Sequence, residues 1–146
     1  MASNPLIGTW SLVSWENRSV VDGGVSYPLG KDAVGYIMYG QDGYMSVAIM
    51  HPDRAEFAAG DLLSGSAQER AQAAGTYVSY CGRYEFRGDT VVHRVELSLF
   101  PNWVGVEQER IVEVAGNRLT LSTQPILLGG VQRTAHLIWE AVGVSE

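Results

Sequence analysis

The chain has 146 residues, 46% of them hydrophobic, which is enough to bury the core of one domain. Its formal charge of −6 argues against a nucleic-acid partner, because phosphate binding needs a basic surface. The sequence has no apolar run near the roughly 20 residues that span a bilayer and no basic amphipathic stretch. We therefore expect a single domain over residues 1–146, with neither nucleic acid nor a membrane as partner.

The N-terminus and the cysteine content predict a cytoplasmic location. Residues 1–5 carry neither the charged region nor the apolar region of a signal peptide. Cys81 is the single cysteine, so it cannot form an internal disulfide, as is usual in a reducing compartment. We expect Cys81 to act as a small hydrophobic side chain rather than as a catalytic thiol.

Eight segments have the composition and turn spacing of strands. Short connections at Asp42-Gly43, Arg87-Gly88 and Ala115-Gly116 contain a glycine suited to tight hairpins. Consecutive hairpins predict an all-β, up-and-down antiparallel sheet, which closes into an eight-stranded barrel to remove its edges. The predicted strands are Thr9–Arg18, Val34–Gln41, Tyr44–Met50, Thr76–Phe86, Asp89–Phe100, Trp103–Val114, Asn117–Thr123 and Val131–Val142.

Two longer connections interrupt this pattern. Val20–Lys31 is a glycine-rich loop with room for a short extra hairpin. His51–Gly75 contains the one predicted helix, because Ser66 and Glu69 form a capping box before the alanine-rich run Ala67–Ala74. This helix is either a plug over one barrel end or a mobile lid over a ligand.

The alternation of Trp103–Val114 indicates which face is inside. One face carries three glutamates and the other carries four valines, so burial of the valine face is far less costly. That choice places Gln108 and Arg110 inside the barrel.

Hairpin register then brings other side chains to the same level. If Phe100 faces Trp103 across the turn, His93 lies opposite Arg110 and Val95 lies opposite Gln108. Carried through the adjacent turns, the register places Gly82 beside His93 and Leu121 opposite Arg110. The interior residues predicted in this way are Tyr80, Tyr84, Val91, Val95, Leu97, Leu99, Val106, Val112, Leu119, Leu121 and Trp139. The faces of the strands within 34–50 stay undecided, since both are apolar.

Three polar side chains in an apolar barrel are typical of a ligand pocket. A buried guanidinium needs a partner, and Arg110 has no predicted inward carboxylate, so an oxygen of a ligand is one candidate. His93 could move a proton, which makes His93, Arg110 and Tyr80 the candidate catalytic residues. Alternatively, His93 is a core histidine and Arg110 and Gln108 reach a barrel mouth. The candidate ligand-binding residues are Gln108, Tyr84, Val95, Leu97, Val106, Leu121, Trp139 and Trp103.

Other site chemistries lack their signatures. His51, His93 and His136 fall on separate segments, so we expect no metal site. Neither a dinucleotide fingerprint nor a nucleophile elbow is present, and we expect no cofactor.

Several segments together resemble the bacterial and fungal lipocalin-like domain proteins, over nearly the whole chain. They are Leu6–Glu16 with its Gly-x-Trp opening, Gly35–Tyr39, Asp42–Ser46, Tyr80–Glu85, Val92–Gly105 and Gln108-x-Arg110. The resemblance implies a calycin-type barrel with a central cavity. It also implies functions that range from carriers to isomerases and cyclases of natural-product pathways. Unlike the usual secreted lipocalins, this chain has no cysteine pair, which favours an intracellular role.

Three functions follow from these observations. The first is an intracellular module that binds a hydrophobic, oxygenated small molecule in the barrel. The second is a cofactor-independent isomerase, cyclase or dehydratase of polyketide-like or terpenoid-like substrates. In that enzyme Arg110 and Gln108 would stabilise a charged oxygen while His93 or a tyrosine moves a proton. The third is a structural or protein-interaction barrel, with a homodimer as its expected form.

Overall fold

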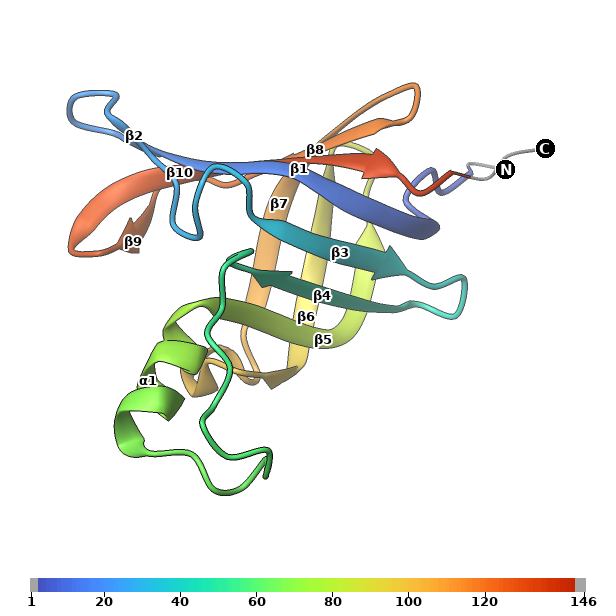
Figure 1. The fold of residues 1–146 in the computed structure, drawn as a ribbon. Helices are drawn as coiled ribbons and strands as arrows, with labels where there is room; N and C mark the ends of the chain where they lie inside the picture. The colour runs from blue at the N-terminus through green and yellow to red at the C-terminus, as the bar shows by residue number, and fades with distance from the viewer. Residues whose placement is uncertain (1–2, 144–146) are drawn as a thin grey trace.

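The computed structural model describes residues 3–143 and confirms the predicted fold class: a closed, eight-stranded antiparallel β-barrel with one helix outside it (Figure 1). The elements are β1 (Gly8–Ser19), β2 (Val25–Ser26), β3 (Val34–Tyr39), β4 (Tyr44–Met50), α1 (Ala67–Gly75), β5 (Tyr77–Phe86), β6 (Thr90–Ser98), the short 3-10 helix η1 (Pro101–Trp103), β7 (Glu107–Ala115), β8 (Arg118–Ser122), β9 (Ile126–Leu128) and β10 (Val131–Ala141).

Closure of the barrel depends on the first strand. β1 pairs with β3 on one side and with β10 on the other, so the order around the barrel is β1-β3-β4-β5-β6-β7-β8-β10. Neither β1 nor β10 is therefore left as an exposed edge. β2 and β9 are short additions that pair with β1 and β10, and β2 is the short extra hairpin expected within 20–31.

The predicted hairpin registers are wrong by two residues at three consecutive turns. His93 lies opposite Gln108 rather than Arg110, and Arg110 lies opposite Val91. Gly82 lies opposite Val95, while Tyr84 is the residue opposite His93. Because side chains alternate with period two, a shift of two keeps every face and changes only the neighbours.

The turns explain these shifts. The β5–β6 turn is centred on Gly88-Asp89, one residue later than predicted, since the Arg87 amide donates to the Thr90 carbonyl. The β6–β7 connection is no tight Pro-Asn turn, because η1 occupies it and Gly105 has a φ of 83°. Glycine adopts such a positive φ without the steric cost that other residues incur.

A bulge in β6 reverses the predicted orientation of the residues after Val95. Gly82 pairs with Val95, but Cys81 pairs with Leu97, so one extra residue enters β6 between them. The two backbones approach so closely that a Cβ on Gly82 would lie 2.0 Å from the Arg94 carbonyl oxygen. Leu97 and Leu99, predicted to be inside, are therefore outside, with Leu97 66% exposed.

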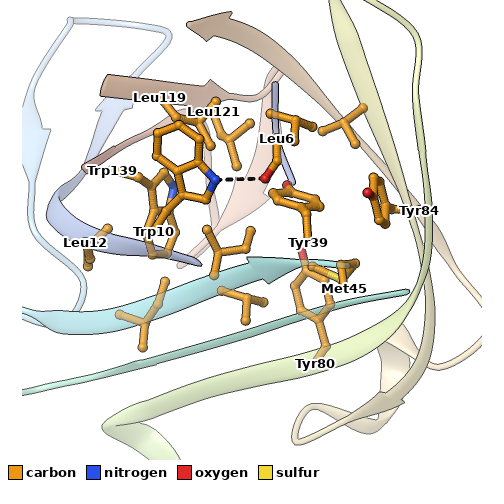
Figure 2. Packing of buried hydrophobic residues seen from close by; sticks show 14 of the residues in the cluster. Leu6, Trp10, Leu12, Tyr39, Met45, Tyr80, Tyr84, Leu119, Leu121 and Trp139 are labelled. Atoms are coloured by element: carbon orange, nitrogen blue, oxygen red, sulfur yellow. Dashed lines mark hydrogen bonds between the residues drawn. The ribbon is translucent and has the colours of Figure 1, made fainter. Parts of the chain in front are cut away.

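One end of the barrel is closed by the segment that precedes β1. Leu6 is fully buried there, and its carbonyl accepts a hydrogen bond from Trp10 Nε1 at 2.9 Å (Figure 2). Tyr84 packs edge-on against Tyr39 and donates its hydroxyl to the Gly40 carbonyl. Leu119 is fully buried and completes this packing, which we call the closed end.

The helical segment does not plug the barrel. The capping box is confirmed, because Ser66 Oγ accepts from the Glu69 amide and Glu69 accepts from the Ser66 amide. However, every residue of α1 keeps solvent exposure, and α1 lies outside the barrel beside the start of β5 (Figure 1). No helix within residues 3–143 is long and apolar enough to cross a membrane.

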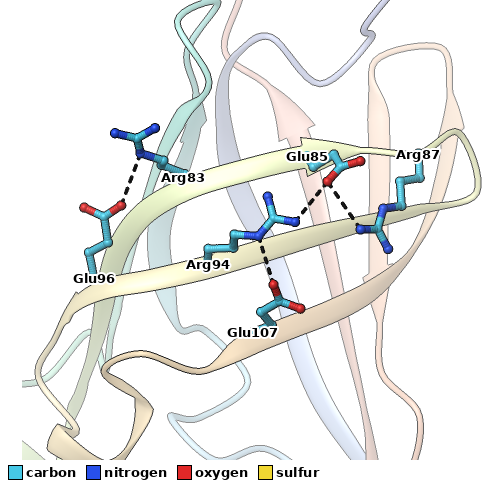
Figure 3. A network of polar contacts seen from close by, with 6 residues as sticks. All are labelled: Arg83, Glu85, Arg87, Arg94, Glu96 and Glu107. Atoms are coloured by element: carbon cyan, nitrogen blue, oxygen red, sulfur yellow. Dashed lines mark hydrogen bonds and ion pairs between the residues drawn. The ribbon is translucent and has the colours of Figure 1, made fainter.

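The outer face of β5, β6 and β7 carries a ladder of ion pairs (Figure 3). Arg94 contacts Glu107 at 2.9 Å and Glu85 at 3.1 Å, and Glu85 also contacts Arg87. All these groups are solvent-exposed, so each pair contributes little stability. Because side chains alternate along a strand, the outward position of Arg94 goes with an inward position of His93, which is 1% exposed.

Candidate functional site

A mostly apolar cavity lies inside the barrel, away from the closed end. It encloses about 80 Å³. Three of the four tryptophans line it, and Arg110, His93 and Tyr80 are its strongly polar members. The lining residues are Trp15, Ile37, Val47, Ile49, Val78, Tyr80, His93, Trp103, Arg110, Leu121, Thr123, Ile126, Leu128, Ala135, Leu137 and Trp139.

The cavity adjoins a surface depression of about 410 Å³. The two spaces share a ring of residues from η1, β7, the segment after β8, and β9, and we call this ring the neck. Its members are Trp103, Arg110, Thr123, Ile126 and Leu128. An enclosed cavity of roughly 150 Å³ holds benzene, so a larger ligand would occupy the cavity together with the neck and the depression.

His93 is held between two tyrosines. Its Nε2 lies 2.7 Å from the Tyr39 hydroxyl and its Nδ1 lies 2.7 Å from the Tyr80 hydroxyl. A neutral imidazole has one N–H donor and one acceptor nitrogen, so one tyrosine donates to the ring and the other accepts from it. Tyr80 lies on the cavity side of this chain, because it is among the lining residues while Tyr39 is not.

Burial keeps this chain neutral. Removal from water, helped by the positive charge of Arg110, lowers the pKa of His93 to about 3. Burial also raises the pKa of Tyr39 and of Tyr80, and the Arg110 charge opposes both rises. His93 is thus an uncharged ring with both nitrogens occupied at neutral pH.

Arg110 and Gln108 project to the same side of β7. Arg110 Nη2 donates to Gln108 Oε1, and Arg110 Nη1 donates to the backbone carbonyl of Glu109 at 3.0 Å. The amide orientation of Gln108 follows, since only its oxygen can accept from a guanidinium. Gln108 Nε2 is buried and has no partner among the described residues.

A second unpaired donor lies deeper in the barrel. Trp139 is fully buried, and its Nε1 has no hydrogen-bond partner in the part of the chain that the structure describes. Buried N–H groups are nearly always satisfied by protein, water or ligand. An oxygen of a bound molecule or of a water would satisfy this one.

The structure brings most of the predicted site residues together. The three candidate catalytic residues, His93, Arg110 and Tyr80, all line the cavity. Leu121, Trp139 and Trp103 line it too, with Trp103 edge-on to Tyr80. Gln108 and Val106 line the depression instead.

Three predicted ligand-binding residues lie elsewhere. Tyr84 belongs to the closed end, where Asn4 Nδ2 donates to its hydroxyl at 3.0 Å. Val95 is buried but is not among the lining residues. The interior placement of Leu97 is wrong because the β6 bulge turns it outward. Val106 was also placed inside, yet it is 41% exposed, since β7 begins only at Glu107.

The sequence interpretation missed several lining residues, for three reasons. A bulge in β1 between Leu12 and Ser14 adds one residue to the strand. Leu12 and Trp15 therefore both face inward, although strict alternation would put them on opposite faces. The face of β4 was undecided, because the long 51–76 connection transmits no register from β5. β9, which contributes Ile126 and Leu128, is too short for a recognisable pattern. The outward Met38 and inward Ile37 could be distinguished only by pairing with β1.

The arrangement combines an apolar enclosure with hydrogen-bond donors at its neck. Such a site can orient an oxygenated small molecule by its acceptor atoms. Both ring nitrogens of His93 are occupied by tyrosine hydroxyls. His93 can therefore act as a base toward a ligand only after one of these two hydrogen bonds has broken.

The comparisons with known proteins agree with this geometry. The sequence model of the lipocalin-like domain family matches residues 7–142. The chain is 36% identical over 104 residues to the 4'-hydroxy-3'-methoxypropiophenone carrier protein ppsC of Aspergillus oryzae, and the match covers 65% of this chain and 94% of that protein. No solved structure matches the chain.

Proposed function

Since the chain belongs to the lipocalin-like domain family, we propose that it is an intracellular carrier that holds a hydrophobic, oxygenated small molecule in its barrel. The observation that carries the proposal is the apolar cavity that adjoins a surface depression at a neck containing Arg110. Carriers need a site that encloses the apolar part of a molecule and a few polar groups that orient it. The name of the Aspergillus relative makes aryl ketones with a phenolic oxygen the first candidate ligands.

The wall of the cavity suits such a ligand. Trp15, Trp103 and Trp139 present aromatic surface from three different elements. Aromatic rings pack against one another edge-on or offset, with about 0.5–1.5 kcal/mol beyond the area they bury. The same tryptophans provide the readout, because a ligand stacked among them quenches their fluorescence.

Binding is tested with 4'-hydroxy-3'-methoxypropiophenone as probe and tryptophan fluorescence as readout. Ala135→Leu adds volume to the cavity wall, whereas Ala48→Leu adds the same volume on the outer face of β4. We expect saturable quenching by the wild type and by Ala48→Leu, and about tenfold weaker binding by Ala135→Leu. Circular dichroism and urea midpoints confirm that both variants fold. Equal affinities in all three proteins would place the ligand outside the barrel and overturn the proposal.

A cofactor-independent isomerase, cyclase or dehydratase is the second candidate, and the Tyr80 hydroxyl favours it. Tyr80 lines the cavity and its hydroxyl lies 2.7 Å from His93 Nδ1, which is a suitable position for a proton donor. Tyr80→Phe removes the proton and keeps the ring. Loss of product formation in Tyr80→Phe, with probe binding retained, would support the enzyme. Turnover that is unchanged in this variant would remove Tyr80 from the mechanism.

A further inference from the structure

The neck and the adjoining part of the depression, where Gln108 lies, are rich in hydrogen-bond donors. Gln108 is 7% exposed, and its oxygen is already used by Arg110, so its unpaired Nε2 offers two N–H groups and nothing that accepts. Arg110 itself has five N–H donors and no acceptor. Both side chains lie on β7, two residues apart and on the same side of the strand.

Arg110 has no counter-charge inside the barrel. It makes no ion pair with any carboxylate of residues 3–143, in contrast to Arg83, Arg87 and Arg94 on the outer face. The cavity lining contains no acidic residue among those described. A half-buried guanidinium without a counter-charge keeps part of its desolvation cost unbalanced.

The acidic residues nearest in sequence face the other way. Glu107 and Glu109 reach the rim of the depression, but they alternate with Gln108 and Arg110 and belong to the outer face of β7. Glu107 is engaged by Arg94 at 2.9 Å. From Glu109, Arg110 Nη1 contacts the backbone carbonyl and forms no ion pair with the carboxylate.

The remaining polar groups near Arg110 carry no charge. These are His93, Tyr80 and Tyr39, which form the buried hydrogen-bonded chain, and Thr123. Thr123 Oγ1 accepts from the Ala135 amide, so its own proton is available to donate. A ligand at the neck therefore meets one positive charge and several donors.

We propose that the barrel takes its ligand as an oxygen anion, a phenolate or a carboxylate, which Arg110 and the Gln108 amide bind at the neck while the apolar part fills the cavity. This inference rests on the proposed carrier function and specifies its ligand class. A guanidinium holds an oxyanion by charge-assisted hydrogen bonds, which are about twice as strong as neutral ones. Amines are excluded, because they would bring a second positive charge to the same place.

The first experiment compares two probes that differ in one ionisable group. 4'-Hydroxy-3'-methoxypropiophenone has a phenol whose ionised form absorbs at longer wavelength, and 3',4'-dimethoxypropiophenone cannot ionise. An opposite charge within about 4–6 Å lowers the pKa of an acid by about 1–3 units. We expect the apparent pKa of the bound phenol to fall by at least one unit, which corresponds to about tenfold tighter binding of the phenolate. The dimethoxy compound should bind with an affinity that is independent of pH.

The protein groups that face the site do not titrate in the pH range used to measure the pKa of the bound phenol. His93 has a pKa lowered to about 3 by burial, and burial raises the pKa of both Tyr80 and Tyr39. From the segment after β8 and from β9, the neck receives Thr123, Ile126 and Leu128, which do not titrate. Glu107 and Glu109 at the rim are present in the measurements with both probes, so any effect they have cancels in the comparison.

Two arginine variants identify the residue responsible. Arg110→Met removes the charge at the neck, and Arg118→Met removes a charge at an exposed position next to the β7–β8 turn. We expect Arg110→Met to restore the ordinary pKa of the bound phenol and Arg118→Met to leave the shift intact. Gln108→Leu should weaken phenolate binding several-fold with a smaller change in pKa.

A second set of probes distinguishes the two kinds of oxyanion. 3-Phenylpropanoate, 3-phenylpropanamide and 3-phenylpropylamine share one apolar group and differ in charge. Tenfold or greater preference for the carboxylate, lost in Arg110→Met, supports a carboxylate ligand, and a shifted phenol pKa supports a phenolate. If all five probes bind with equal affinity at every pH, or if Arg110→Met changes neither preference, the anion site is refuted and the carrier function stands. If none of the five binds saturably, both proposals are refuted.

Discussion

The two ends of the barrel use the same kinds of residues in opposite ways. At the closed end, Trp10 and Tyr84 are fully packed and their polar atoms bind backbone carbonyls. At the neck, Trp103 and Arg110 stay partly exposed, and Gln108 beside it keeps an unpaired donor. A fully satisfied end contributes stability, whereas an end with unsatisfied donors keeps its binding capacity for a ligand. One end of the barrel thus contributes mainly to stability, and the other end is available for ligand binding.

The largest effect should come from a cavity at the closed end. Leu119→Ala should lower the free energy of unfolding by about 2–5 kcal/mol, because Leu119 is fully buried in tight packing. Leu128→Ala, the matched change at the neck, should cost less than about 1 kcal/mol, since Leu128 is only partly buried. Urea denaturation of both variants measures the difference. Similar losses would show that the two ends are equally important for folding.

A second change acts on the bulge between these two regions. Gly82→Ala would place a methyl group against the Arg94 carbonyl oxygen, so β5 and β6 must separate. We expect a loss of about 1–3 kcal/mol in the free energy of unfolding. Gly75→Ala in α1 is the control, because a Cβ there meets no atom and helix propensity favours alanine. An unchanged denaturation midpoint in Gly82→Ala would contradict the close approach.

The buried histidine gives the protein a pH-dependent stability. The pKa of His93 is lowered by burial from 6.5 to about 3, so the unfolded chain binds more protons than the folded one between these pH values. The stability contributed by neutral His93 is complete above pH 6.5 and is lost as the pH falls. We expect a loss of about 2 kcal/mol between pH 6.5 and 5, where carboxylates are still mostly ionised.

Histidine variants assign this dependence. His93→Gln should flatten the stability profile between pH 6.5 and 5. His136→Gln should keep most of the slope, because His136 is partly exposed, although burial lowers its pKa as well. A slope that persists in His93→Gln would mean that other groups control the acid sensitivity.

The smallest effect is expected on the outer surface. Arg94→Met removes the central cation of the ladder in Figure 3, and exposed pairs contribute about 0.2–1 kcal/mol each. We expect a loss below about 1 kcal/mol that vanishes at 1 M salt, where screening is strong. Probe binding should not change. A salt-insensitive loss would show that the contribution of Arg94 is not electrostatic.

The sequence predicted the architecture and the inward faces of β5, β7 and β8, because strand alternation is a local property. It did not predict the true neighbours of His93, since they depend on turns whose centres differ from the predicted ones by one residue. Tyr39 was missed because β3 and β4 are apolar on both faces. The bulge at Gly82 was invisible to alternation, and it put Leu97 on the wrong face. The closure of one end by Leu6 depends on a contact outside any strand.

The packing of the closed end has a kinetic consequence. A molecule that enters through the neck does not leave through the closed end, because side chains of the described residues fill it. A second molecule therefore cannot push the first one out from behind, and exchange is strictly sequential. The rate of release should be independent of the concentration of a competitor. Release also begins with whichever group lies at the neck, so a receiving protein would meet the charged head of the cargo before its apolar body.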